Sequence, residues 1–303
     1  MMKQLIGFLL ILGAFTSYGQ LDSVKLQVLQ EGEAKLQELG DTILTHQIFE
    51  KRQAANYAFI KQLTQTLKTE NSYEYGFPNL RMVSIVNAPD NAFRVFTWQV
   101  QTKGELVRHY GAIQLNGEEL QLIPLLDRSD DIANPLTHIG SNKEWVGALY
   151  YDILKETKGK KTYYFLLGLD INNPFSNKKL IDALQFTEDG QAVFGAAVFP
   201  AKNPRDLNAR YILEYRGDAS TSVKYNKKMR SIVFDHLIPL AERYEGAYAY
   251  YVPDGTYDAL RWKQGQWIFE RNIIETSFDN LEDLDQNKSK EGQSKSDEFY
   301  RPN

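Results

Sequence analysis

Alternation between apolar and polar side chains is the feature that most constrains the fold of this 303-residue chain. From residue 81 to residue 271 the alternation has a period of two, the period of a β-strand with one buried face. Pairs of turn-forming residues that end in glycine interrupt it, because glycine adopts positive φ without a steric penalty. We expect hairpins at four such pairs: Asn116-Gly117, Asp189-Gly190, Asp254-Gly255 and Gln264-Gly265.

The register of two hairpins can be predicted by counting outwards from the turn. Around Gln264-Gly265 the count places Trp262 opposite Trp267 and Leu260 opposite Phe269, on one apolar face. Around Asn116-Gly117 the same count predicts one apolar face made of Ile113, Leu115, Leu120 and Leu122.

Two segments are apolar almost throughout, 145–154 (WVGALYYDIL) and 163–169 (YYFLLGL). A strand of this kind is covered on both faces. The charged turn 155–161 separates the segments, so we expect them to pair as a central hairpin. Further strands are expected at 94–101, 179–187, 192–199, 211–216, 220–225, 231–234 and 247–252.

These patterns predict a mainly β fold, an antiparallel meander in residues 80–275 that follows an N-terminal helical element in residues 20–75. We favour a propeller-like arrangement, because four-stranded blades of about 40–50 residues fit the spacing of the strands. A sandwich or an irregular barrel explains the same pattern, and both stay open since the sequence has no clear internal repeat.

The segment 21–70 has helical periodicity, with apolar residues at spacings of mostly four. We expect Gly40 to end a first helix that begins near Ser23, and Asp41 to cap a second one. The apolar stripe is interpreted as core packing that covers one face of the central hairpin. Its members are Leu44, Ile48, Ala55, Phe59, Leu63 and Leu67.

The first nineteen residues predict a secretory signal peptide. Lys3 precedes an apolar run from residue 5 to residue 15, and the small residues Ser17 and Gly19 lie just before Gln20. The run is too short for a permanent membrane helix, which needs about 20 apolar residues. We therefore expect cleavage before Gln20 and export to the periplasm or the cell exterior.

The chain contains no cysteine, which excludes disulfides, thiolate zinc sites and thiol catalysis, and we expect no lipid attachment through cysteine. The net charge of −4 is mild and the basic residues are scattered along the sequence, so we expect no nucleic-acid partner. After the leader, no run approaches the roughly 18 apolar residues of a membrane span, so no transmembrane segment is expected. The charged segment 279–303 predicts a disordered tail.

A resemblance to other proteins agrees with export. The stretches 163–199 (YYFLLGLDINNPFSNKKLIDALQFTEDGQAVFGAAVF), 231–237 (SIVFDHL) and 88–98 (APDNAFRVFTW) resemble exported proteins of Bacteroidota-type bacteria. The resemblance covers most of the chain after Ala88, and the leader that ends in SYGQ fits the same source. It implies export from a Gram-negative bacterium and brings no known activity.

The segment 170–177 (DINNPFSN) holds the densest group of candidate ligand-binding side chains. Asp170, Asn172 and Asn173 follow an apolar strand, where carboxylate and amide oxygens can hold a hard cation or a sugar. The segment lacks the glycine and the terminal glutamate of a calcium loop, so no cofactor is predicted and calcium stays an alternative. These side chains can instead bond their own backbone and shape an Asn-Pro turn.

His236 is the remaining candidate ligand-binding residue. It follows Asp235 on a predicted strand, where neighbouring side chains face opposite ways, so the two form no dyad. We expect His236 to be a partly buried, hydrogen-bonded imidazole, with a functional histidine as the alternative. The four histidines are scattered and form no metal-binding motif, so no metal site is predicted.

Three carboxylates, Asp127, Asp130 and Asp131, follow the expected strand 120–126. With Asp170 they are the candidates for paired acid and base groups of a glycoside hydrolase. Because they share a polar loop with Arg128 and Ser129, we interpret them as solvated turn residues and predict no catalytic residue.

The sequence therefore predicts an exported envelope protein that binds another protein or a glycan without catalysing a reaction. Two alternatives stay open. One is a hydrolase that acts on carbohydrate through paired Asp residues, and the other is a structural subunit of a periplasmic or outer-membrane-associated complex.

Overall fold

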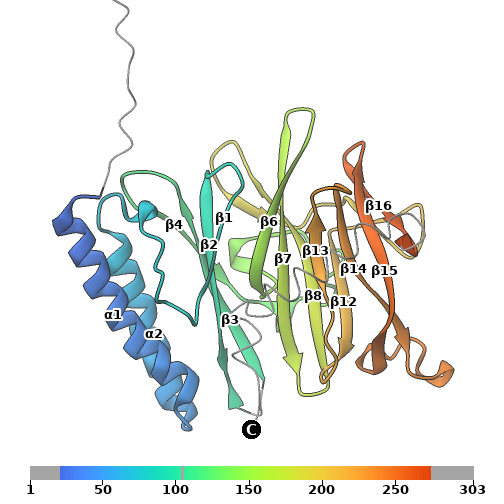
Figure 1. The fold of residues 1–303 in the computed structure, drawn as a ribbon, viewed down its shortest axis with the longest axis horizontal. Coiled ribbons are helices and arrows are strands. Elements are labelled where there is room, and N and C mark those ends of the chain that lie inside the picture. The colour runs from blue at the N-terminus through green and yellow to red at the C-terminus, as the bar shows by residue number, and fades with distance from the viewer. Residues whose placement is uncertain (1–20, 104–105, 274–303) are drawn as a thin grey trace, which may run out of the picture.

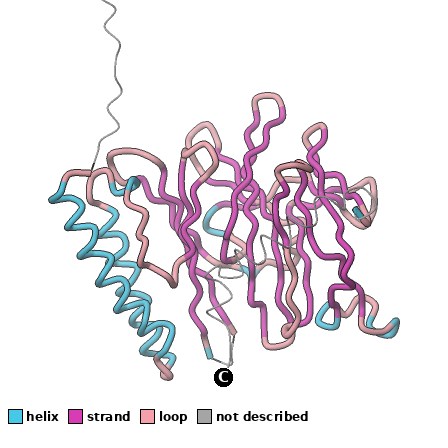
Figure 2. Tube along the Cα trace, in the orientation of Figure 1, coloured by secondary structure: helices cyan, strands magenta, loops and turns pink. Residues whose placement is uncertain are grey.

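The computed structural model describes residues 21–103 and 106–273, so the predicted leader at 1–19 and the predicted tail at 279–303 lie outside the described residues. It confirms a mainly antiparallel β fold with an N-terminal helical element. Figures 1 and 2 show the elements arranged as successive layers, with the helices at one side and the sheets beyond them. Within the described ranges, no helix has the length and apolar character needed to cross a bilayer.

The helical layer is an antiparallel pair, α1 (Ser23–Thr45) and α2 (Phe49–Leu67). The prediction that Gly40 ends the first helix was wrong, because α1 continues through Gly40 and Asp41 and ends only at Thr45. Gly40 is there for close packing: a Cβ at this position would lie 2.6 Å from the sulfur of Met82. A short 3₁₀ turn, η1 (Ser72–Glu74), follows α2 and leads into the β region.

The first sheet has the order β1-β2-β3-β4, with β1 (Ser84–Asn87), β2 (Phe93–Gln101), β3 (Val107–Leu115) and β4 (Gln121–Leu126). The helices cover this sheet, and Phe59 and Leu63 of α2 share one apolar cluster with Phe96 and Trp98 of β2. The stripe is therefore core packing, as predicted, but it does not cover the central hairpin. Leu44 and Ile48, two expected members of the stripe, are exposed.

The hairpin predicted at Asn116-Gly117 has a different register. Leu115 pairs with Gln121 and Ile113 pairs with Ile123, so the connecting loop spans residues 116–120 rather than two residues. The three-residue slip is odd, and an odd slip moves side chains to the opposite face of a strand. Leu120 and Leu122 accordingly pack toward the helices, whereas Ile113 and Leu115 face the second sheet.

The second sheet forms the middle β layer in the order β5-β9-β8-β7-β6, and β12 also pairs with β8. The predicted central hairpin is confirmed as β6 and β7, joined by a two-residue turn at residues 159–160. The strands are β5 (Gly140–Ser141), β6 (Leu149–Lys158), β7 (Lys161–Asn173), β8 (Ser176–Phe186), β9 (Ala192–Phe194) and β12 (Arg210–Arg216). The Asp189-Gly190 pair lies in the loop between β8 and β9, and a small separate pair is formed by β10 (Phe199–Pro200) and β11 (Leu207–Asn208).

The third sheet has the order β13-β14-β15-β16, with β13 (Val223–Asn226), β14 (Ser231–Pro239), β15 (Tyr251–Lys263) and β16 (Gln266–Glu270). The register around Gln264-Gly265 is confirmed, with Trp262 opposite Trp267. The hairpin predicted at Asp254-Gly255 was wrong, since these residues form an irregularity inside β15. The β14–β15 register shifts there between Asp235 and Leu237. The strand expected at 247–252 begins only at Tyr251, after the 3₁₀ turn η6 (Tyr248–Tyr250).

The sheets pack face to face through two large apolar clusters. Phe93 and Ile113 of the first sheet meet Leu166 of β7. The preceding residue of β7, Phe165, packs with Phe234 and Trp267 of the third sheet. The middle sheet is therefore covered on both faces, which explains its continuous apolar segments. No sheet closes on itself within the described residues, so the arrangement is an open stack.

Candidate functional site

The structure brings three of the chain's titratable side chains together where the first and second sheets meet. His109 Nδ1 lies 3.6 Å from Asp127 Oδ2, and His109 Nε2 lies 3.7 Å from Asp170 Oδ1. The His109 side chain is 3 % exposed, and those of Asp127 and Asp170 are 8 % and 15 % exposed. The group is an imidazole between two carboxylates, sequestered from bulk solvent.

Each of these residues is supplied by a different element. His109 belongs to β3, Asp127 directly follows β4, and Asp170 lies near the end of β7 in the neighbouring sheet. His109 shares the inward face of β3 with Ile113, because residues at even spacing on a strand point the same way. A histidine in an otherwise apolar face is the sequence signal that could have singled it out.

Asp127 is held by a local hydrogen-bond network. Its Oδ1 accepts hydrogen bonds from the backbone N and the Oγ of Ser129, at 3.0 and 2.6 Å, and its Oδ2 accepts one from the His109 backbone N at 2.9 Å. Ser129 Oγ in turn accepts a hydrogen bond from the backbone N of Gly147. Gly147 permits this packing, since a Cβ there would lie 2.7 Å from both Asp127 Cγ and His109 Cβ.

The pKa values of the two carboxylates are shifted in opposite directions. Burial alone would raise the pKa of Asp127, but contacts with His109 and Ser129 outweigh it and hold that pKa well below its usual range. Burial raises the pKa of Asp170, only partly offset by the charges of His109 and Lys178. Carboxylates whose pKa values are pushed apart are the usual components of an acid–base pair.

The Nε2 atom of His109 is buried and has no hydrogen-bond partner in the described part of the chain. Asp127 lies on the Nδ1 side of the ring, and Asp170 lies on the Nε2 side. The arrangement places an imidazole between two carboxylates, which are the types of group used in general acid–base catalysis.

Asp130 and Asp131, predicted with Asp127 as a carboxylate group, do not join this site. Their side chains are 91 % and 68 % exposed, and they lie 3.8 Å from Arg108 and 3.3 Å from Arg128. Both belong to the short 3₁₀ turn η3 (Ser129–Asp131). They are therefore solvated turn residues, whereas Asp127 is not.

A buried polar chain continues from the site into the middle sheet. The rings of His109 and Trp145 meet edge to face with their centres 6.4 Å apart, and Trp145 Nε1 donates to the Tyr150 hydroxyl at 2.8 Å. The ion pair between Asp182 and Arg210 is completely buried, with Nε and Oδ1 3.1 Å apart. Buried, hydrogen-bonded polar groups of this kind favour one fixed geometry of the core around them.

In the turn after β7 the backbone-bonding interpretation is confirmed for Asn173, whereas Asn172 bonds side chains. Asn173 Oδ1 accepts hydrogen bonds from the backbone N of Phe175 at 2.8 Å and of Ser176 at 3.1 Å. Asn172 accepts from Lys178 Nζ at 2.6 Å and donates to Ser176 Oγ at 2.8 Å. No group of three or more His, Asp or Glu side chains is placed to hold a metal ion in residues 21–103 and 106–273.

His236 lies in the third sheet and does not join Asp170. Its Nδ1 is 2.7 Å from Oδ2 of Asp258, and its side chain is 18 % exposed. This confirms the expected partly buried, hydrogen-bonded imidazole. The partner Asp258 also accepts a hydrogen bond from the backbone N of Asn272. Three of the four predicted ligand-binding residues thus cluster near β7, and His236 is separate.

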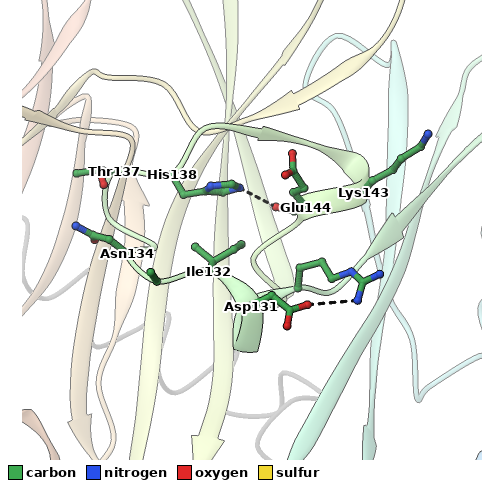
Figure 3. A pocket seen from close by; sticks show the side chains of 9 residues that line it. Asp131, Ile132, Asn134, Thr137, His138, Lys143 and Glu144 are labelled. Atoms are coloured by element: carbon green, nitrogen blue, oxygen red, sulfur yellow. Dashed lines mark hydrogen bonds and ion pairs between the residues drawn. The ribbon is translucent and has the colours of Figure 1, made fainter.

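An open cleft of about 610 Å³ lies beside the site, between η3 and η4 (Asn142–Glu144). Its lining includes two cationic side chains, Arg128 and Lys143, and two anionic ones, Asp131 and Glu144. The polar side chains of His138, Asn134 and Thr137 also line it. In Figure 3 the Lys143 side chain points away from His138 and Asn134. Arg128 is paired with Asp131. The cleft therefore has no dominant charge that would select a ligand.

A second candidate surface is the loop between β14 and β15, residues 240–250, which we call the tyrosine loop. Tyr244 and Tyr250 stack with ring centres 4.2 Å apart, and Arg243 lies 4.7 Å over the Tyr244 ring. The Leu240 backbone N donates to Tyr250 O and closes the loop. The large side chains exposed on and beside it are Ile238, Leu240, Tyr248 and Tyr250.

No family model, no curated protein and no solved structure matches the chain.

Proposed function

We propose that this chain is an exported, non-enzymatic binding protein whose partner, another protein, docks on the tyrosine loop. The single observation that carries the proposal is the exposure of the loop: Tyr248 and Leu240 are 53 % and 49 % exposed. Clustered exposed apolar and aromatic groups mark interaction sites, because isolated proteins seldom leave them in water.

The loop is ordered before any partner arrives. Stacked rings, the Arg243 contact and the hydrogen bond from the Gly246 backbone N to the Tyr251 hydroxyl hold its conformation. The 3₁₀ turn η6 packs against β8 and β12 of the middle sheet. A preformed loop loses little conformational entropy on binding, which favours affinity.

A protein partner fits the composition of this surface better than a glycan. Tyrosine and arginine side chains dominate the binding energy of protein interfaces. Exposed aliphatic groups, here Ile238 and Leu240, gain free energy when they are buried against apolar side chains. They gain less against the hydroxyl groups of a sugar.

Site-specific photocrosslinking in the organism that encodes the chain tests this proposal. A photoreactive phenylalanine at position 248 is expected to give one discrete protein adduct, and the adduct is expected to disappear when Leu240→Ser is added. Position 57 on α2 is the matched control, since Tyr57 is 60 % exposed but lies away from the loop. Equal adducts from both positions, or none from either, would contradict it. Binding to purified cell-wall glycan that Tyr248→Ala abolishes would make the partner a glycan.

The second candidate function is a carbohydrate-acting hydrolase, favoured by one observation: His109 lies between Asp127 and Asp170. In this mechanism Asp170, whose pKa is raised by burial, protonates the leaving glycosidic oxygen, and the Asp127–His109 pair accepts a proton from the attacking water. The assay is release of reducing ends from a panel of soluble polysaccharides and peptidoglycan. Activity that a folded Asp170→Asn variant loses, and Asp130→Asn keeps, would replace the binding function with this one.

A further inference from the structure

Three hairpin turns lie at the same end of the molecule. They join β6 to β7, β13 to β14 and β15 to β16, and Figure 1 shows the first and third projecting beyond the sheets on the same side. Contacts between them confirm the proximity. Trp262 Nε1 donates to Thr157 O at 3.5 Å, and Arg261 Nη1 donates to Met229 O at 2.9 Å.

The β6–β7 turn and the β15–β16 turn are in direct contact. The hydrocarbon part of the Lys158 side chain packs over Gly265, where a Cβ would clash with it. Arg230 in the β13–β14 turn lies close enough to Glu156 of β6 for its charge to lower the pKa of that carboxyl, against the larger effect of burial. The three turns thus form one continuous surface, although Thr157 and Trp262 beside the first and third turns lie 105 positions apart in the sequence.

This surface is strongly basic. Its exposed charged side chains on the turns are all cationic: Lys158, Lys160, Lys161, Lys227, Lys228, Arg230 and Lys263. Two acidic side chains beside them are only partly exposed: Glu156, and Glu270, which pairs with Arg261 and Lys263. Two more, Glu188 and Asp189, are exposed in the β8–β9 loop at the same end of the middle sheet. The chain as a whole carries a net charge of −4, opposite in sign to this surface.

We propose that this basic end docks the protein on an anionic lipid surface. Each Lys or Arg held near anionic headgroups contributes to membrane attraction, and clusters of four to eight are typical of such sites. Six of the seven cations are lysines, which act as flexible point charges, whereas shaped carboxylate or phosphate sites favour the planar arginine fork. The cations stand on projecting turns, which suits an extended surface better than a strand lying in a groove.

Vesicle co-sedimentation with the full chain tests the proposal. At low salt, the protein is expected to bind vesicles of phosphatidylcholine mixed with phosphatidylglycerol and not vesicles of phosphatidylcholine alone. Binding is expected to fall steeply as salt is added, because exposed charges are screened. The triple variant Lys160→Glu, Lys161→Glu and Lys227→Glu is expected to bind about 100-fold more weakly.

A matched control changes the same charge elsewhere. Lys51→Glu, Lys61→Glu and Lys68→Glu alter three exposed lysines in and just after α2, and this variant is expected to sediment like the wild type. Equal losses in both triple variants would show that only net charge matters and would overturn the proposal. Equal binding to neutral vesicles would also overturn it, as would binding to a sulfated polysaccharide without binding to anionic vesicles. Far-ultraviolet circular dichroism of both variants establishes that they are folded.

Discussion

The Nε2 atom of His109 lies 3.7 Å from Oδ1 of Asp170, although the two residues belong to different sheets. The contact ties the first β layer to the middle one at a polar point within an otherwise apolar interface. The two carboxylates that flank His109 have pKa values shifted in opposite directions, so each predicts a different dependence of stability on pH.

Replacing Asp127 is expected to destabilise the fold. Its pKa is lowered, so its carboxylate stabilises the folded state above the ordinary Asp pKa near 4, and the stabilisation is lost as pH falls below it. We expect Asp127→Asn to lower the free energy of unfolding by about 2 kcal/mol at neutral pH. Urea denaturation at neutral pH and at about pH 3 measures the effect, which should shrink in acid. A constant difference would contradict the assignment.

Replacing Asp170 is expected to have the opposite effect. Burial raises its pKa, so the folded state holds the proton more tightly than the unfolded chain does. Ionisation therefore opposes folding as pH rises above the ordinary Asp pKa. Asp170→Asn should raise the free energy of unfolding by about 1 kcal/mol at neutral pH and by less in acid. The exposed Asp130→Asn is the control, and a destabilised Asp170→Asn protein at neutral pH would refute the expectation.

Gly147 is expected to tolerate no side chain. A Cβ there would lie 2.7 Å from Asp127 Cγ and from His109 Cβ, both of which are held in place. Gly147→Ala should lower the free energy of unfolding by about 2 kcal/mol through overpacking. Gly76→Ala serves as the control, because nothing lies within 4 Å of a Cβ at that position. Thermal unfolding followed by circular dichroism compares the two, and equal midpoints would argue against the close packing described.

Glu33 gives a further prediction in the helical layer. This carboxylate is 2 % exposed, accepts a hydrogen bond from the Tyr75 hydroxyl at 2.5 Å and one from the Asn79 backbone N at 2.7 Å. Tyr75→Phe removes one donor and leaves a buried carboxylate less satisfied, at a cost of about 2 kcal/mol. Tyr57→Phe, on the exposed face of α2, should leave the urea midpoint unchanged. A stable Tyr75→Phe protein would mean that water replaces the hydroxyl.

The turn at Gln264-Gly265 offers a stabilising substitution. Gln264 and Gly265 both have positive φ, 51° and 82°. Asparagine tolerates this conformation better than glutamine, because its short side chain bonds the local backbone. Gln264→Asn is expected to raise the free energy of unfolding by about 0.5 kcal/mol. Chemical denaturation measures the change, and Gln266→Asn, just beyond the turn, should not reproduce it.

The two hairpin turns with predicted registers show why one prediction succeeded and the other failed. At Gln264-Gly265 a two-residue turn fixes the pairing locally, so counting outwards is enough. At Asn116-Gly117 the loop is longer, and its first residue is fixed by a distant contact, the hydrogen bond from the Asn116 backbone N to Ala92 O. Asp254-Gly255 has the composition of a turn, but β15 continues through these residues. They form an irregularity in its pairing with β14.

The candidate site could be predicted only in part. The turn role of Asn173 and the hydrogen-bonded state of His236 follow from local chemistry, and both are confirmed. The meeting of His109 with Asp170 depends on how two sheets stack, and no local pattern encodes that distance. The basic end is missed for the same reason, since its lysines are dispersed in sequence and gather only when three hairpins align.

The tyrosine loop joins β14 to β15 at one end of this antiparallel pair. The lysine-bearing turns lie at the other end of the same two strands. The thirteen residues of β15 span roughly 40 Å. A molecule bound to a lipid surface through the lysine-bearing turns would therefore present the tyrosine loop on the side that faces away from that surface. Because the two surfaces lie at opposite ends of the hairpin, one chain would suffice to bridge two binding partners.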